Sequence, residues 1–377
     1  MRVGVTDTPS ENWFHMWAAP SYSSIDEDFA AIAELGVDHV RLFPLWPLLQ
    51  PNAGWIDPKA VDRVLDVVEL AKTHGLDAEV DVLQGHLSSF DFLPSWVSTW
   101  HEANIFTEPR VVEAEERLIR LLARELSGVE GAFGLGLGNE IVQFSAARNP
   151  HAYPLTQAQA ATWTQRLLSV AKEQWPDGIH SISFDEDVWF DDFMPFTPEL
   201  AASAGDVTTV HSWIFGKVGE HYGDDYDALV LFARYLVELA NAWGNRPIWL
   251  QEIGAPVPLI SPERSAGFLT DVLGTLASAP NLEAVTWWCS HDVNRKFADF
   301  PELEYSLGLL DSQNRVKPAG KALKRAIGAF VEKPAGVRGA LSFDGTRRSQ
   351  TAPGGELFAA WLEAAKEGQM LALEESI

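Results

Sequence analysis

Strand-like and helix-like segments alternate along most of this chain, and eight such units can be counted. This alternation predicts a parallel sheet in which a helix connects each strand to the next. A chain of 377 residues could hold two average domains or one α/β barrel, and the eight units favour the barrel. The predicted strands are Arg2–Thr6, His39–Phe43, Ala78–Leu83, Ala132–Gly138, His180–Phe184, Val207–His211, Pro247–Glu252 and Ala284–Trp288.

Several predicted helices begin at recognisable caps. Ser24-Ile-Asp-Glu27 and Thr156-Gln-Ala-Gln159 fit capping boxes. Asp57-Pro58 and Ser261-Pro262 pair an N-cap residue with proline at the first helical position. An eighth barrel helix is expected near Pro318–Phe330.

The composition changes after the eighth helix. Residues Glu332–Gly355 are rich in Gly, Pro, Ser and charge, with one strand-like island at Ala340–Phe343, and Glu356–Leu373 is expected to form a short helix. We therefore predict a (β/α)8 TIM barrel over residues 1–331. A C-terminal appendage over residues 332–377, too small to be a domain of its own, is expected to pack on it.

Charge and cysteine content restrict the partners and the compartment. A formal net charge of −25 argues against nucleic acid or an anionic membrane as partner, and a neutral substrate fits better. The single cysteine, Cys289, excludes an intramolecular disulfide and a thiolate metal cluster. No run resembles a signal peptide or a membrane span, so a cytoplasmic location is expected. The oligomeric state stays open, a homo-oligomer included.

Two predicted strands end in a carboxylate: Gly134-Leu-Gly-Leu-Gly-Asn139-Glu140 and Pro247-Ile-Trp-Leu-Gln251-Glu252. Barrel enzymes place their chemistry at the carboxyl ends of their strands. Glycoside hydrolysis needs two carboxyl groups, one to protonate the leaving oxygen and one to attack or stabilise the sugar carbon. The first run reads as a closely approached barrel strand, and it lacks the third glycine of a dinucleotide-binding fingerprint.

Polar and aromatic residues follow the other predicted strands, and together they suit a sugar. An aromatic face packs on the apolar face of a pyranose, while imidazole, amide and carboxylate groups bind its hydroxyls. Arg41 could pair with Glu252 and keep it ionised. The substrate-binding candidates are Arg41, Gln84, His86, Asn139, His211, Trp213, Trp288 and Asp292.

Other chemistries have little support in the sequence. It contains no His-Glu-x-x-His zinc motif, no Gly-x-Ser-x-Gly elbow and no phosphate loop, and His101-Glu102-Ala-Asn104 lacks the second histidine. We expect no metal and no cofactor. A metal-dependent barrel enzyme built from scattered His and Asp stays an alternative, but it leaves the two glutamate-terminated strands unexplained.

These strand ends resemble glycoside hydrolase family 5, whose members are retaining barrel enzymes with glutamates after strands four and seven. The resemblance covers roughly the first 330 residues as a barrel. It implies that Glu140, after Asn139, is the acid/base and that Glu252 is the nucleophile. It also matches Arg41 to the arginine after strand two and His86 to the histidine after strand three.

Two features of the family pattern need interpretation. The tryptophan of strand eight is matched by Trp288 in a Trp-x-x-x-Asp pattern that ends at Asp292, with Trp287 as second candidate. The His-x-Tyr pattern after strand six reads His211-Ser-Trp213, so the tyrosine that normally donates to the nucleophile is missing. Either another hydroxyl such as Tyr222 replaces it, or Arg41 and His211 alone hold Glu252.

Three longer runs resemble subfamily 18 of family 5, whose members are exo-β-mannosidases. They are Asn12-Trp-Phe-His15-Met-Trp17, His39-Val-Arg41-Leu-Phe-Pro-Leu-Trp46-Pro, and Gln84-Gly-His86-Leu-Ser-Ser-Phe-Asp-Phe-Leu-Pro-Ser-Trp96. The resemblance implies release of mannose from mannosyl-β-1,4-N-acetylglucosamine of N-glycan cores by double displacement. Glu140 should then have a raised pKa, from burial and the charge of Glu252.

Two other functions stay open. An endo-acting mannanase or glucanase could use the same barrel, and long loops after strands one, three and eight (Asp7–Tyr22, Gln84–Thr107 and Cys289–Ser306) could instead block one end and favour exo action. A sugar-binding barrel that lost turnover is the second alternative, since a fold alone does not settle activity.

Overall fold

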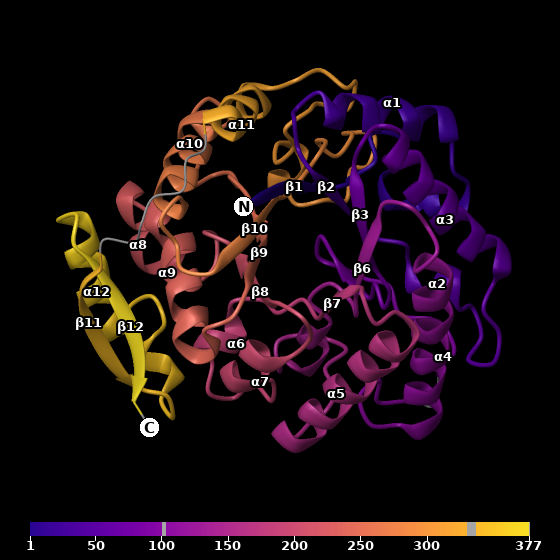
Figure 1. Cartoon of the computed structure of the whole chain (residues 1–377), viewed down its shortest axis with the longest axis horizontal. Coiled ribbons are helices and arrows are strands. Elements are labelled where there is room, and N and C mark those ends of the chain that lie inside the picture. The colour runs from indigo at the N-terminus through magenta and orange to yellow at the C-terminus, as the bar shows by residue number, and fades with distance from the viewer. Residues whose placement is uncertain (100–102, 330–336, 377) are drawn as a thin grey trace.

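The computed structural model describes residues 1–99, 103–329 and 337–376, and its centre is an eight-stranded parallel sheet rolled into a barrel (Figure 1). The strand order β7-β6-β3-β2-β1-β10-β9-β8 follows the chain, so the predicted fold class is confirmed. The barrel strands are β1 (Arg2–Thr6), β2 (His39–Leu42), β3 (Asp77–Asp81), β6 (Ala132–Gly136), β7 (Ile179–Ser181), β8 (Thr208–Ser212), β9 (Ile248–Ile253) and β10 (Leu282–Trp287).

Helices surround the barrel, and short elements decorate its loops (Figure 1). The helices are α1 (Tyr22–Ala33), α2 (Trp46–Leu49), α3 (Pro58–Thr73), α4 (Pro109–Leu126), α5 (Gln157–Gln174), α6 (Asp187–Phe190), α7 (Pro198–Ser203), α8 (Lys217–Tyr222), α9 (Tyr226–Gly244), α10 (Ser265–Leu276), α11 (Pro318–Ala329) and α12 (Glu356–Lys366). The loops contain the 3-10 turns η1 (Trp13–Ala18), η2 (Ile141–Ser145), η3 (Glu302–Tyr305) and η4 (Arg348–Gln350), and the hairpin of β4 (His86–Leu87) and β5 (Phe90–Asp91). Among the described residues, no helix combines the length and apolar character that a bilayer crossing requires.

Two of the four predicted helix starts are confirmed. Thr156 caps α5 through a full capping box, in which its hydroxyl accepts from the Gln159 amide at 3.3 Å. Asp57 caps α3, with proline at the first position.

The other two predicted starts are wrong. Helix α1 begins at Tyr22, and its N-cap is Ser21 instead of Ser24, because the Ser21 hydroxyl accepts from the Ser24 amide. Helix α10 begins at Ser265, since the chain after Ser261 first makes a separate turn.

At one seam the barrel is closed by isolated hydrogen bonds, one of them from the Asp206 amide to the His180 carbonyl at 2.8 Å. Within the described ranges, no backbone ladder pairs β7 with β8. Instead, the Thr209 hydroxyl donates to the Ile182 carbonyl at 2.6 Å and accepts from the Phe184 amide at 3.3 Å. One hydroxyl thus bridges two backbone groups that a ladder would otherwise pair.

The glycine run of β6 is closely approached, as predicted. A Cβ atom at Gly136 would lie 2.2 Å from a carboxylate oxygen of Asp81, and one at Gly138 would lie 2.7 Å from the Leu83 carbonyl. Gly138 also has a φ of 139°, which L side chains rarely adopt. The run therefore lets β3 and β6 approach closely just before Glu140.

Three loops on the catalytic face pack together through aromatic rings. Trp13 follows β1, Phe90 follows β3, and Phe300 follows β10. Their ring centroids lie 5.6 Å (Trp13–Phe90), 4.7 Å (Trp13–Phe300) and 4.9 Å (Phe90–Phe300) apart. These are the loops that could block one end of the site. The three rings, which we call the loop cluster, join them into one wall.

The C-terminal residues form a small unit beside α9 (Figure 1). Strands β11 (Val337–Asp344) and β12 (Met370–Ser376) pair in parallel and are connected through α12. The predicted island and short helix are present, but β12 was not predicted. The predicted division at residues 331 and 332 lies outside the described residues.

Packing and polar contacts attach this unit to the barrel side. The ring of Phe358 in α12 lies 4.8 Å from that of Tyr235 in α9. The Arg348 guanidinium donates to the carbonyls of Asp191 at 2.9 Å and Met194 at 3.2 Å. The unit therefore supports the segment that follows α6.

Candidate active site

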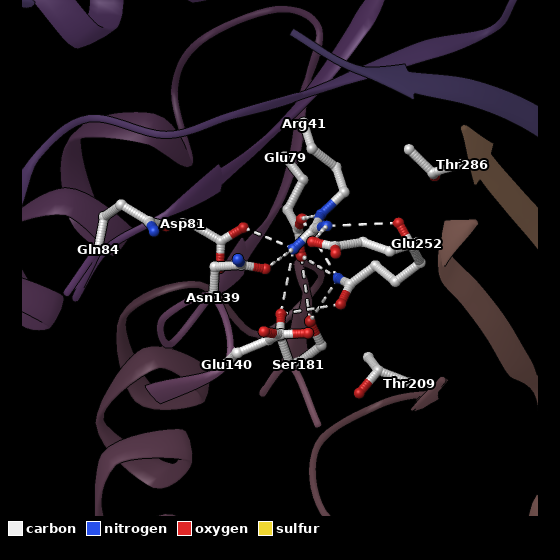
Figure 2. Close-up of polar contacts among 12 residues, drawn as sticks. Arg41, Glu79, Asp81, Gln84, Asn139, Glu140, Ser181, Thr209, Glu252 and Thr286 are labelled. Carbon is white, nitrogen blue, oxygen red and sulfur yellow. Dashed lines mark hydrogen bonds and ion pairs between the residues drawn. The ribbon is translucent and has the colours of Figure 1, made fainter. Parts of the chain in front are cut away.

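A buried arginine organises the bottom of the site. Figure 2 shows Arg41, from the end of β2, surrounded by carboxylates from two other strands, β3 and β9. Its side chain is 0% exposed, and its nitrogens lie 3.1 Å from Glu79 Oε2, 2.9 Å from Asp81 Oδ2 and 3.1 Å from Glu252 Oε1. The rigid guanidinium fork fixes the carboxylate of Glu252 in position.

Three carboxyl groups surround the single positive charge of Arg41. Burial raises the pKa of Glu79 to about 7, and the Asp81 charge adds to this, while Arg41 offsets part of the shift. Burial also raises the pKa of Asp81. The guanidinium therefore holds together groups that would repel one another without it.

Substitution of Arg41 by Met should destabilise the protein strongly. It leaves three buried carboxyl groups without their cation, and breaking a buried pair typically costs about 3–5 kcal/mol. Urea unfolding measures the loss, and Arg110→Met at a surface position, where an ion pair contributes about 1 kcal/mol or less, is the matched control. An Arg41→Met loss no larger than that of the control would contradict the assigned role.

Trp213 takes the place of the missing tyrosine. Its indole Nε1 donates to Glu252 Oε2 at 3.1 Å, while Arg41 holds the other oxygen. Tyr222 lies elsewhere, with its ring 5.3 Å from that of Phe358. Both explanations offered from the sequence are therefore wrong, because Trp213, which stands where the family has tyrosine, itself donates to Glu252.

Substitution of Trp213 by Phe tests this donor. The change keeps an aromatic ring but removes the N–H, and hydrogen bonds to charged groups contribute about 1.5–3 kcal/mol. We expect kcat/KM for a β-mannoside to fall roughly 10- to 100-fold, with the melting temperature nearly unchanged. Trp287→Phe, on the neighbouring strand β10, is the control. Equal kinetic losses in both variants would refute a specific role for Trp213.

Glu140 lies where β6 turns into η2, in a left-handed backbone conformation with φ 45°. Its Oε1 lies 2.7 Å from His211 Nδ1, and His211 Nδ1 lies 3.4 Å from Glu252 Oε2. One ligand atom from each of the three residues lies within 4.8 Å of the others. Retaining glycosidases hold their carboxyl groups about 5–5.5 Å apart, and inverting ones about 6.5–9.5 Å. The separation favours retention.

The pKa directions of the two glutamates differ from the sequence-based expectation. Burial would raise the pKa of Glu140, but the hydrogen bond and charge of His211 lower it below its ordinary value. Burial raises the pKa of Glu252, and His211 and Arg41 offset only part of that shift. The expected raised pKa of Glu140 is therefore wrong for the free protein.

The proton that Glu140 needs lies on its neighbour. His211 Nε2 faces Gln251 Oε1 at 3.3 Å, and the Gln251 amide nitrogen points to Glu79, so this Nε2 carries a hydrogen. Burial lowers the pKa of His211, but the charges of Glu252 and Glu140 raise it above its ordinary value overall. The 2.7 Å contact with Glu140 can thus transfer a proton between the two residues.

A cavity of about 600 Å³ opens above these residues. This volume is in the range of small-ligand sites. Six of the predicted site residues line it: His86, Asn139, Glu140, Trp213, Glu252 and Trp288.

Four predicted residues do not line the cavity. Arg41 and His211 lie behind it and act through the glutamates. Gln84 is buried, and its amide donates to the His86 carbonyl at 2.7 Å. Asp292 pairs with Lys317 at 2.6 Å, so its match to the family pattern does not bring it to the substrate.

Three lining residues have partners that orient them. His86 Nδ1 lies 2.7 Å from Asp91 Oδ1, which leaves its other nitrogen for a ligand. Asn139 Oδ1 accepts from Arg41 at 3.4 Å, so its NH₂ group remains available. Trp288 lines the cavity and packs edge-on against Trp213 with centroids 6.2 Å apart.

Sequence reasoning missed an acidic wall formed by Asp185, Glu186 and Asp187, which follow β7 and line the cavity. Burial raises the pKa of Glu186 to about 8. Arg148 forms an ion pair with Asp187 and lies 3.9 Å from Asp185. The run of three acidic residues directly after a predicted strand could have indicated this wall from the sequence.

Phe215 and Glu304 also line the cavity and were not predicted. Phe215 stacks on Trp213 with ring centroids 5.1 Å apart, and 48% of its surface stays exposed. Its spacing of four residues from His211 could have suggested a second aromatic group after strand six. Glu304 lies deep in the loop after β10, where nothing in the sequence pattern singles it out.

Glu140, His211 and Glu252 also have the spacing of a metal site. However, one oxygen of Glu252 already accepts from Arg41 and the other from Trp213. The positive charge that a cation would supply is thus already present in the guanidinium. Two carboxyl groups are sufficient for glycoside hydrolysis without a metal.

Comparisons with known proteins identify the family. No family model matches the chain, and no curated protein matches it. Among solved structures, GH5_18 from Streptomyces cattleya in complex with Manβ1-4GlcNAc is 43% identical with a TM-score of 0.97, over 100% of this chain and 94% of that one. A GH5_18 from Bifidobacterium longum subsp. infantis is 41% identical with a TM-score of 0.94, over 100% of this chain and 92% of that one.

A more distant structure shares the fold alone. The exo-β-1,4-mannosidase Op5Man5 from Opitutaceae bacterium strain TAV5 is 22% identical with a TM-score of 0.83, over 100% of this chain and 69% of that one. The closer matches extend over the barrel and the C-terminal unit together. With its paired glutamates at the ends of β6 and β9, this chain is a glycoside hydrolase and belongs to family 5, subfamily 18.

Proposed function

We propose that this protein is a retaining exo-β-mannosidase that releases mannose from mannosyl-β-1,4-N-acetylglucosamine. The observation that carries the proposal is the spacing of Glu140 and Glu252, one oxygen of each lying within 4.8 Å of the other, at a cavity of about 600 Å³. Two relatives at 40–43% identity, from Streptomyces cattleya and Bifidobacterium longum, bind Manβ1-4GlcNAc in their crystals. N-glycan cores as the source of this disaccharide, and a cytoplasmic location, stay predictions from the sequence.

The reaction proceeds in two displacements. A Glu252 oxygen bonds to the anomeric carbon while the bond to the N-acetylglucosamine oxygen breaks, and Glu140 protonates that oxygen. Glu140 then takes a proton from water, whose oxygen replaces Glu252 at the same carbon. Mannose leaves with its configuration retained.

His211 supplies the proton for the first displacement. The raised pKa of His211 and the 2.7 Å contact of its Nδ1 with Glu140 Oε1 allow His211 to hold this proton in the free protein. As negative charge grows on the leaving oxygen, Glu140 gives up a proton to it and receives one from His211. His211 is therefore a positioning and proton-holding residue, whereas Glu140 contacts the substrate.

The loop cluster favours exo action. Trp13, Phe90 and Phe300 join the loops after β1, β3 and β10, and neighbouring residues of two of these loops, Ser88, Ser89, Pro301 and Leu303, line the cavity. An endo enzyme needs a cleft open at both ends so that a polymer can pass through it. A cavity that such loops close at one end fits a single terminal sugar better than a continuous polymer.

A chromatographic time course tests the proposal. Mannosyl-β-1,4-N-acetylglucosamine, mannotetraose and cellotetraose are offered in parallel, and NMR identifies the first anomer released. We expect β-mannose from the disaccharide and only terminal release from mannotetraose. Internal cleavage of a tetraose would instead support the endo enzyme, and binding without product would support a sugar-binding barrel.

The pH dependence of kcat/KM should be bell-shaped. Glu252 must be ionised, and because its pKa is raised, activity should fall as the pH drops through a value above 4.5, the ordinary pKa of Glu. The proton shared by Glu140 and His211 is lost as the pH rises through the raised pKa of His211, above 6.5. Initial rates across the pH range measure both limbs. In His211→Asn the alkaline limb should move, and an unmoved limb would refute the shared proton.

A further inference from the structure

The cavity has two chemically different ends. Glu304 belongs to the loop after β10, the strand beside β9, which carries Glu252, and both glutamates line the cavity. By contrast, and in addition to the effect of burial, the charge of Glu140 raises the pKa values of Asp185, Glu186 and Arg148. Since the nucleophile attacks the sugar that is kept and the acid protonates the sugar that leaves, the Glu304 end faces the glycone and the acidic wall faces the aglycone.

Glu304 is held rigidly at the glycone end. It lies in η3, where its amide donates to the Pro301 carbonyl and its carbonyl accepts from the Val293 amide, each at 3.1 Å. Phe300, four residues earlier, anchors this loop in the loop cluster. Ser88 and Trp288 face the carboxyl group across the end of the cavity.

The carboxyl group of Glu304 has no cation to balance it. It is only 6% exposed, and among the described residues no Lys, Arg or His forms an ion pair with it. Burial raises its pKa to about 7, with a further contribution from the Glu252 charge. A buried carboxyl group without a cation lowers the stability of the folded protein. The presence of such a group in this cavity therefore indicates a function.

We propose that Glu304 is a specificity-determining residue that binds hydroxyls of the terminal sugar at the glycone end of the cavity. A carboxyl group offers two oxygens and can bridge neighbouring hydroxyls of one pyranose. Glu304 and Glu252 line the same cavity, which places Glu304 within reach of the sugar that Glu252 attacks. The inference rests on the proposed function and adds the group that recognises the glycone.

Inhibition constants of two small ligands test the proposal. D-mannono-1,5-lactone resembles the glycone, and N-acetylglucosamine is the leaving product. Glu304→Ala should weaken inhibition by the lactone about 10- to 100-fold and leave inhibition by N-acetylglucosamine unchanged. Glu304→Gln, which keeps the shape and the hydrogen-bonding groups, should lose less. Phe215→Ala, on the aglycone side, should show the opposite pattern.

The melting temperature separates recognition from a structural role. Because the Glu304 charge is uncompensated, Glu304→Gln should melt no lower than the wild type. Unchanged lactone inhibition in Glu304→Ala, or loss of both inhibitions together with a lower melting temperature, would overturn the inference. A wild type that binds the lactone through Glu304 but leaves the disaccharide intact would refute only the proposed function. A wild type that neither binds the lactone nor hydrolyses the disaccharide would refute both.

Discussion

Glu252→Gln should lower turnover of mannosyl-β-1,4-N-acetylglucosamine by roughly 10⁴-fold or more while the protein stays folded. The amide keeps the shape of the carboxylate but cannot form the covalent intermediate. It also keeps an oxygen that can accept from Arg41 or Trp213, and burial of one charge fewer limits the loss of stability. Product release under single-turnover conditions measures the effect, and the melting temperature serves as the check on folding.

A matched substitution serves as the control for this result. Glu304→Gln changes the same functional group in the same cavity, but at the end that we assign to recognition. It should reduce turnover far less than Glu252→Gln. A fluorinated mannoside that traps the covalent intermediate should label Glu252 in the wild type, and a label on Glu140 would reverse the assigned roles.

Glu140→Ala should affect substrates according to their leaving groups. Loss of the acid/base should slow hydrolysis of the disaccharide about 10²- to 10⁴-fold. A mannoside with an acidic phenol needs no proton in the first step, so its mannosyl-enzyme should still form and then accumulate. A burst of phenol followed by a slow steady state is the expected trace.

External azide provides the control for this variant. The space left by Glu140 admits a small anion that needs no general base, so azide should restore the second step and yield β-mannosyl azide. Glu252→Ala, treated in the same way, should not give the β product. Equal slowing of all leaving groups without rescue would argue against Glu140 as the acid/base.

The barrel was predictable because local patterns and the global fold agree. The alternation of strand-like and helix-like segments marked all eight barrel strands, and Asp57 and Thr156 marked helix starts by chemistry that acts within a few residues. Strand β12 was missed because its first residues, Met370 to Leu373, were assigned to the predicted helix, which in the structure ends at Lys366, and its last residues look solvent-exposed on their own. Only the parallel pairing with β11 makes them a strand.

The site was predictable to the extent that it follows the strand ends. Glu140 and Glu252 came from that rule, and the structure brings them together. Trp213 could not be read as a donor to Glu252, because that depends on where an indole N–H points. The pKa of Glu140 could not be read either, because His211 comes from a distant strand. Asp292 matched a pattern but pairs with Lys317.

The seam between β7 and β8 bears on how the cavity can move. Seven interfaces of the barrel are held by backbone ladders, whereas this one has only isolated hydrogen bonds, from the hydroxyl of Thr209 and from the Asp206 amide to the His180 carbonyl. Slow amide hydrogen exchange is therefore expected around most of the barrel, with faster exchange at Phe184. The seam lies directly beneath the aglycone end, between the acidic wall after β7 and Phe215 after β8. Breathing there would widen this side of the cavity and also loosen Ser183, whose hydroxyl accepts from Arg41 at 3.1 Å.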